Sequence, residues 1–247
     1  MRAGRNRVFA GLAMGVIAFA GTLACPVWAQ GAARVVELFT SQGCSKCPPA
    51  DRLIASFAKE PGTIALSFAV NYWDYIGWKD TLASSAFTRR QHAYAAARGD
   101  GLVYTPQVVV DGLEARPGAD EAAILHMGET LKGHGGALSV PISLTEANGR
   151  LRIDLGPGPQ TRPVGIYVLR VERTKTVEIG RGENSGRSIT YTNVVRAMNR
   201  IGEWTGAAQQ FDVLELKGEG EGYVVLLQAG TPDKPGAILA AAKTADL

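Results

Sequence analysis

Two cysteines, Cys44 and Cys47, are separated by two residues and follow a short apolar run. The run Val35–Phe39 has the length of a buried strand, and a segment with helical periodicity begins directly after Cys47. A Cys-x-x-Cys sequence on a link from strand to helix is typical of thiol–disulfide exchange. One helical turn brings both sulfurs within bonding distance, so one thiolate can attack a disulfide and the other thiol can resolve the product.

The position of the pair assigns a role to each sulfur. A helix N-terminus supplies partial positive charge and free N–H groups, which stabilise a thiolate. Lys46, inside the motif, adds a cation. We therefore predict that Cys44, at the exposed side of the turn, is the nucleophile and that Cys47 is the resolving thiol.

Two other functions fit the same pair and stay open. One is a copper or zinc carrier that uses both thiolates, and the other is a redox-inert binding module in which a disulfide only ties the turn. Structural zinc takes four ligands, and Cys25 is the only further cysteine. The histidines, His92, His126 and His134, show no ligand-like spacing. The sequence therefore predicts no metal ligand set and no cofactor.

The N-terminus has the three parts of a secretory signal peptide. Arg2, Arg5 and Arg7 are followed by the uncharged apolar run Val8–Ala24, and Val27-Trp28-Ala29 predicts cleavage after Ala29. We expect export to the bacterial periplasm and no stable membrane insertion after cleavage. Secretion, or lipid anchoring at Cys25 through the partial lipobox Leu23-Ala24-Cys25, is the alternative.

Cleavage changes the charge and the cysteine count. It removes three arginines and no acid, so the 26 Lys and Arg residues become 23, equal to the 23 Asp and Glu residues. A near-neutral chain gives no argument for binding nucleic acid or membrane. Cys44 and Cys47 become the only cysteines, and an oxidising compartment favours their disulfide at rest. The expected partner is a protein thiol or disulfide.

The aromatic segment 71–80 begins where a second buried strand, Thr63–Val70, is expected to end. In open α/β sheets, binding crevices lie at the carboxyl ends of the strands. We therefore expect Tyr72, Trp73 and Trp78 to form a wall beside the cysteines. A loop that only packs its own aromatic side chains is the alternative.

The remaining pattern of the first half predicts the order β-α-β-α-β-β-α. The expected elements are Val35–Phe39, a helix ended by Pro61-Gly62, Thr63–Val70, a helix from Ser84 or Ser85 to about Arg98, Val108–Val110, Leu113–Arg116 and a helix from about Asp120 to Lys132. This order, the Cys-x-x-Cys and Thr105-Pro106 before the third strand resemble the thioredoxin fold in its short, glutaredoxin-like form. The resemblance implies a cis peptide bond at Pro106, which would face the cysteines and, with Thr105, present backbone to an extended substrate.

A second resemblance is closer. The runs VVELFTSQGCSKCPPAD, YWDYIGWKD, RRQHAY, YTPQVVVDG and GRGENSGR resemble a family of exported bacterial proteins, DUF1223, which couples a thioredoxin-like domain to a β-rich one. The likeness covers nearly all of the mature chain. Asn71 and Val70 stand where members commonly have aspartate and often have histidine, so the resemblance assigns these two positions no role.

After the glycine-rich stretch 133–136 the apolar residues alternate, as in half-buried strands. About eight short strands with turn signals predict an all-β sandwich. The expected organisation is a signal peptide at 1–29, an α/β thioredoxin-like domain at 30–133 and a β-sandwich domain at 134–247.

The polar hairpin tip Gly180–Arg187 carries Arg181 and Arg187. Its glycines permit sharp turns, and its polar side chains can recognise a partner. We hypothesise that the tip leans toward the cysteines and that one arginine pairs with Asp74 or Asp80 to restrict substrate entry. A merely solvated tip is the alternative.

Overall fold

The computed structural model describes residues 1, 31–160, 162–214 and 217–247. The predicted signal peptide therefore lies, apart from Met1, outside the described residues. The helices and strands are β1 (Arg34–Thr40), α1 (Pro48–Phe57), β2 (Thr63–Ala69), η1 (Asp74–Ile76), α2 (Ser85–Arg98), β3 (Gln107–Val110), β4 (Glu114–Pro117), α3 (Glu121–Leu131), η2 (His134–Gly136), β5 (Ile142–Ala147), β6 (Arg150–Leu155), β7 (Val164–Glu178), β8 (Ser188–Trp204), β9 (Gln209–Leu214), β10 (Glu221–Thr231) and β11 (Lys234–Lys243).

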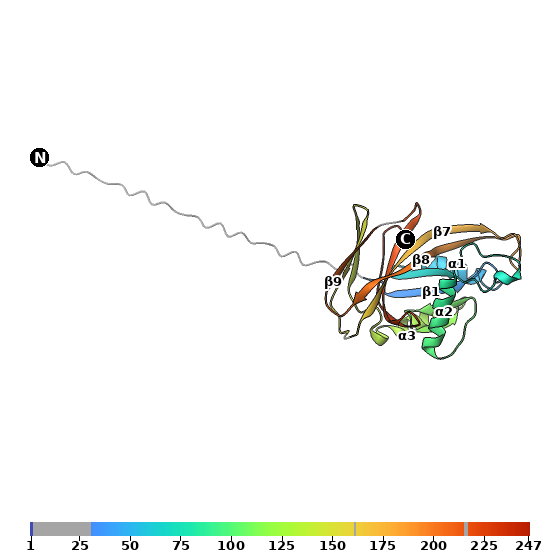
Figure 1. Ribbon diagram of the computed structural model, residues 1–247, viewed down its shortest axis with the longest axis horizontal. Coiled ribbons are helices and arrows are strands. Elements are labelled where there is room, and N and C mark those ends of the chain that lie inside the picture. The colour runs from blue at the N-terminus through green and yellow to red at the C-terminus, as the bar shows by residue number, and fades with distance from the viewer. Residues whose placement is uncertain (2–30, 161, 215–216) are drawn as a thin grey trace.

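Most strands belong to one mixed sheet of eight, in the order β11-β10-β7-β8-β2-β1-β3-β4. β1 pairs in parallel with β2 and antiparallel with β3. β2 pairs in parallel with β8 at Ser67 and Val194. Figure 1 shows β7 and β8 side by side as two long strands. A separate sheet of three has the order β5-β6-β9.

The predicted fold class, an α/β thioredoxin-like domain followed by an all-β sandwich, is wrong. Strands expected to form the sandwich, β7, β8, β10 and β11, instead extend the sheet of β1–β4 through the β2–β8 pair. The edge of β2 that faces away from β1 would otherwise expose unpaired backbone groups, and β8 covers it. The local pattern of apolar residues cannot show that two strands so far apart in sequence pair with each other. The chain division after residue 133 stays a prediction.

One hydrophobic cluster joins the two halves of the chain. It contains Phe39 and Phe68 from β1 and β2 together with Leu169, Leu226 and Ile238 from β7, β10 and β11. The sheet curls so that β11 returns to the loop after β3, where the Ile238 N–H donates to the Asp111 carbonyl at 2.9 Å. The first strands and the last strands of the chain therefore share one hydrophobic core.

A buried ion pair crosses the same boundary. Arg90 of α2 donates to both carboxylate oxygens of Glu37, at 2.9 and 3.1 Å, and to Gln228 of β10 at 3.0 Å. Glu37 is fully buried, and such a charge is tolerated because Arg90 pairs with it. Helices α1 and α3 contribute Ile54, Phe57 and Ile124 to a second core against β1 and β3. None of the helices described is long and apolar enough to cross a membrane.

Candidate redox site

The cysteines lie in the loop between β1 and α1. Pro48 and Pro49 begin α1, where the missing proline N–H removes no helical hydrogen bond, and Cys47 is the residue before the first turn. The Cys44 N–H donates to the Ser41 carbonyl and the Cys47 N–H to the Cys44 carbonyl, each at 3.1 Å. A tight turn therefore holds the pair, and both residues are free thiols in this structure.

Cys44 is less exposed than we predicted, because only 2% of it is accessible. Its pKa is nevertheless lowered to about 6. The largest cause is a hydrogen bond from the Cys47 thiol, and contributions from Thr105 and from the backbone N–H groups of Lys46 and Cys47 outweigh the opposing effect of burial. Much of Cys44 is therefore a thiolate at neutral pH, which is the reactive form.

Cys47 has the opposite character. Burial raises its pKa far above the ordinary range, and donation to Cys44 and the charge of Asp51 raise it further. The Thr40 hydroxyl acts in the other direction. The two thiols thus differ strongly in acidity, with the pKa of Cys44 lowered and that of Cys47 raised.

Asp51 is a site residue that the sequence reasoning missed. It lies one helical turn after Cys47, on the same face of α1, and is 2% exposed. Its Oδ1 accepts a hydrogen bond from the Thr40 hydroxyl at 2.7 Å. Burial raises its pKa to about 8, so near that pH it can both accept and donate a proton. The signal available in the sequence was an acid four residues after the second cysteine.

Thr105 lies against Cys44, and Pro106 follows Thr105. The bond between them is cis, as the resemblance implied. The Cys44 Sγ lies 3.7 Å from the Thr105 carbonyl oxygen. Thr105 is held from the other side by Trp73, whose Nε1 donates to the Thr105 hydroxyl at 2.8 Å.

The aromatic segment forms the predicted wall beside the loop. Trp78 Nε1 donates to Gln42 Oε1 at 2.8 Å, two residues before Cys44. A Cβ at Gly43 would lie 2.9 Å from the Cβ of Trp73, so only glycine fits the loop there. Tyr72 is partly buried and packs on the shared core, and burial raises its pKa to about 12.

The hairpin tip Gly180–Arg187 contacts the cysteine loop, as we hypothesised. The Asn184 side chain is fully buried and donates from Nδ2 to the carbonyls of Gln42 and Cys44, each at 2.9 Å. Glu183 accepts from the Ser45 N–H at 3.2 Å. The tip, which joins β7 to β8, is therefore part of the site and helps to cover Cys44.

The predicted arginine contacts are wrong. Arg187 donates to Asn184 Oδ1 at 3.1 Å, and Arg181 is exposed; neither is paired with Asp74 or Asp80. Asp80 instead accepts from the backbone N–H groups of Gln42 and Leu82, each at 2.8 Å. The Asp80 carboxylate is buried, and its hydrogen bonds hold the cysteine loop in place.

Lys46 is exposed. The pKa of Glu183 is lowered mainly by hydrogen bonds from Ser45, and the Lys46 ammonium adds a smaller contribution. The Lys46 backbone N–H, by contrast, contributes to the Cys44 thiolate. The stabilising role that we predicted for its side chain stays a prediction.

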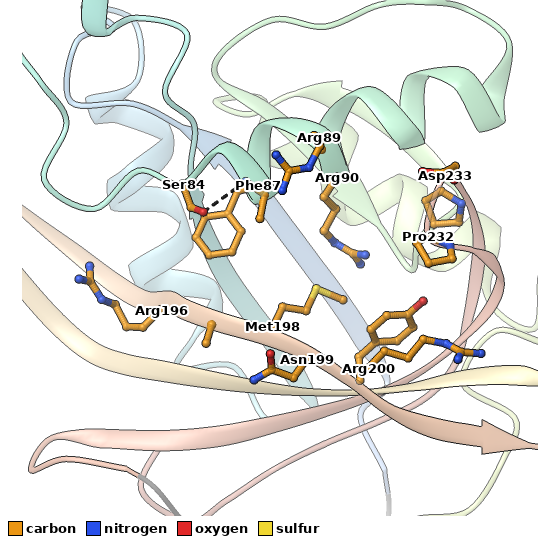
Figure 2. Close-up of a pocket in the computed structure, with 14 residues that line it drawn as sticks. Ser84, Phe87, Arg89, Arg90, Arg196, Met198, Asn199, Arg200, Pro232 and Asp233 are labelled. Atoms are coloured by element: carbon orange, nitrogen blue, oxygen red, sulfur yellow. Dashed lines mark hydrogen bonds between the residues drawn. The ribbon is translucent and has the colours of Figure 1, made fainter.

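The described residues contain no group of three or more His, Cys, Asp or Glu side chains arranged to hold a metal ion. A cavity of about 490 Å³ lies between α2 and β8, with Phe87 and Arg90 pointing into it toward Met198 (Figure 2). None of the predicted site residues lines it. Three arginines that line this cavity form ion pairs, Arg90 with Glu37, Arg196 with Glu172 and Arg200 with Glu203. These carboxylates therefore balance the positive charge of the three arginines.

Comparison with known proteins gives a family but no activity. Residues 35–228 match the family described as "Protein of unknown function (DUF1223)". A crystal structure of a structural genomics target from Agrobacterium tumefaciens is 34% identical, with a TM-score of 0.78, and the match covers 87% of this chain and 95% of that one. HBP35 of Porphyromonas gingivalis has a similar fold, with a TM-score of 0.60 at 12% identity, over 87% of this chain and 76% of that one. No curated protein matches the sequence.

Proposed function

This chain belongs to the DUF1223 family, whose description assigns no chemistry, and we propose from the geometry of its site that it catalyses thiol–disulfide exchange. The observation that carries the proposal is the opposite perturbation of two adjacent thiols. The pKa of Cys44 is lowered to about 6, whereas that of Cys47 is raised far above its ordinary range. A disulfide that merely ties a turn needs no such difference.

The exchange proceeds in two steps. The Cys44 thiolate attacks one sulfur of a substrate disulfide, and the other substrate sulfur leaves as a thiolate. Cys47 then loses its proton and attacks Cys44 Sγ, which expels the second substrate thiolate and forms the Cys44–Cys47 disulfide. Two electrons pass from the cysteine pair to the substrate, and the reverse sequence oxidises a substrate dithiol.

Asp51 supplies the proton chemistry that Cys47 needs. The Thr40 hydroxyl interacts with Cys47 and donates to Asp51 Oδ1, so it connects the thiol to the carboxylate. An acceptor with a pKa of about 8 suits proton transfer near neutral pH. In the reverse reaction the protonated acid returns the proton to Cys47.

The substrate class follows from what surrounds Cys44. The Thr105 carbonyl beside Cys44 Sγ offers a backbone acceptor to an extended peptide, and Trp73 and Trp78 offer apolar surface. The substrate in this proposal is therefore a protein thiol or disulfide, and with the signal peptide that we predict, the exchange would take place in the bacterial periplasm. Arg181 and Arg187 lie on the tip that a substrate must displace or contact.

The proposal is tested by titrating the purified mature protein against redox buffers, together with metal analysis. An exchange enzyme gives a reversible two-electron couple and no stoichiometric metal. Cys47→Ala should accumulate mixed disulfides on Cys44 in a periplasmic extract, whereas Cys44→Ala should not. A pair that cannot be reduced reversibly, or copper or zinc bound stoichiometrically by the reduced protein, would reject the proposal.

A further inference from the structure

The two oxygens of the Asp51 carboxyl group have different surroundings. Oδ1 accepts the Thr40 hydrogen bond on the side of the cysteines. Oδ2 is buried and has no hydrogen-bond partner among the described residues. A buried, unpaired polar oxygen costs free energy and therefore requires an explanation.

Asp51 also lines a cavity of about 510 Å³ between α1 and the beginning of β8. The cavity is lined by Pro48, Asp51, Arg52, Arg187, Ser188, Ile189 and Thr190. Arg52 and Arg187 form no ion pair with a carboxylate in the part of the chain that the structure describes, and Arg187 donates only to Asn184. The N-terminus of α1, at Pro48, adds partial positive charge to the same space.

The groups around Asp51 come from five parts of the chain. They are Cys44 and Cys47 from the cysteine loop, Arg52 from α1, Asp80 from the loop before α2, and Arg187 and Tyr191 from the tip and β8. Arg52, Arg187 and Asp51 line the same cavity. A negative ion in the cavity is therefore attracted to the two arginines, in the space that Asp51 also lines.

We propose that this cavity is the route by which Asp51 exchanges its proton with solvent, and that it takes a small oxyanion, held between Arg52 and Arg187, as the proton carrier. This inference rests on the proposed thiol–disulfide exchange. Because its pKa is about 8, Asp51 is mostly protonated near neutral pH, and it first gives this proton to a hydrogenphosphate dianion or a chemically similar oxyanion, which leaves as the monoanion. The Asp51 carboxylate then accepts the Cys47 proton when Cys47 attacks. The cavity opens beside α1 and β8, so the proton leaves without crossing the wall formed by Trp73 and Trp78.

The resolving step can be followed with dithiobis-nitrobenzoate, which releases one coloured thiolate when Cys44 attacks and a second when Cys47 resolves. At fixed pH and ionic strength, the second phase should accelerate with inorganic phosphate and then saturate, by at least about threefold. An equal concentration of a cationic amine buffer, or of a bulky sulfonate buffer, should not accelerate it. Thr190→Phe, which fills the cavity, should remove the phosphate effect.

The matched variants are Arg52→Gln with Arg187→Gln, and Lys59→Gln with Lys132→Gln as a control of equal charge change outside the cavity. Only the arginine pair should lose the saturable phosphate effect. A second phase that does not depend on phosphate, or one that keeps the dependence without both arginines, would overturn the inference while leaving the proposed exchange intact. A protein that shows the first phase and never the second would overturn the proposed function itself.

Discussion

The unequal pair of thiols depends on the burial of Cys47 and on one contact, the hydrogen bond from Cys47 to Cys44. It is the largest cause that lowers the pKa of Cys44 and also one that raises the pKa of Cys47. We predicted that the Lys46 ammonium stabilises the thiolate, whereas the contribution seen here comes from the Lys46 backbone N–H. In the proposed exchange, Cys47 is thus both the resolving thiol and the group that activates Cys44.

We therefore expect alkylation of Cys44 in the reduced protein to follow a thiolate with a pKa of about 6, while Cys47 stays unreactive. Cys47→Ala should move the Cys44 transition to higher pH, and Cys47→Ser, which keeps a donor, should move it less. Alkylation rate against pH, with each cysteine assigned by mass spectrometry, measures this. Identical transitions in both variants would show that the hydrogen bond is not the cause.

Asp51 should make the protein less stable as pH rises. Its pKa of about 8 in the folded state exceeds the unfolded value of about 3.9, so between these values only the folded state holds the proton. The free energy of unfolding must then fall with increasing pH across this window. Asp51→Asn carries no charge, so it should be more stable than the wild type at pH 8, by roughly 5 kcal/mol for pKa values that differ by about four, and nearly equal at pH 4. Urea unfolding at both pH values is the measurement, and a gain of the same size at both would contradict the mechanism.

At the scale of elements, the hairpin tip between β7 and β8 closes over the loop between β1 and α1. Two hydrogen bonds from one buried amide, Asn184, fix the carbonyls of Gln42 and Cys44. Gly182 has a φ of 81° and lies beside Trp78, which lets the tip approach the aromatic wall. Because only 2% of Cys44 is accessible, we expect a substrate to reach it when this contact opens.

Asn184→Ala should make Cys44 more accessible. Each lost hydrogen bond to a buried carbonyl is worth about 1 kcal/mol, so opening becomes about 10- to 30-fold more frequent. Alkylation of Cys44 by a bulky maleimide at pH 8, where the thiolate is already formed, measures opening rather than ionisation. Ser185→Ala is the control, because its hydroxyl bonds only within the tip, to Gly180 at 3.1 Å. Equal rates in the two variants would show that the tip does not limit access.

The sequence predicted the elements better than their assembly. Periodicity and turn residues placed α1, α2, α3 and the strands β1 to β4 within a few residues, because each signal is local. The cysteines and Thr105-Pro106 were predicted for the same reason, through motifs with fixed spacing. Asp51 was missed, and the contact of Asn184 with the cysteine loop was not predicted, because both depend on burial, and burial is set by neighbours from distant parts of the chain.

At the scale of the whole molecule, the long strands β7 and β8 decide the architecture. We expected only short strands in a separate sandwich, whereas β7 is one strand of 15 residues. Its length lets one end pack with β10 on the shared core while the other carries the tip to the cysteines. The second half of the chain is therefore both a support for the first sheet and a contributor to its site.

A shared core predicts a single cooperative unfolding transition. Leu226 of β10 is fully buried with Phe39 and Phe68 of the first half, so Leu226→Ala should cost about 2–5 kcal/mol of unfolding free energy. The loss should appear equally in circular dichroism, which reports all strands, and in the exposure of Cys47 to alkylation, which reports the first half alone. Two independent domains would instead leave Cys47 protected while the second half unfolds. Leu214→Ala on β9, where 66% of the residue is exposed, is the control and should change stability by less than about 0.5 kcal/mol. Coincident shifts in both probes for Leu226→Ala, and in neither for Leu214→Ala, would establish that the redox site and the distant strands fold as one unit.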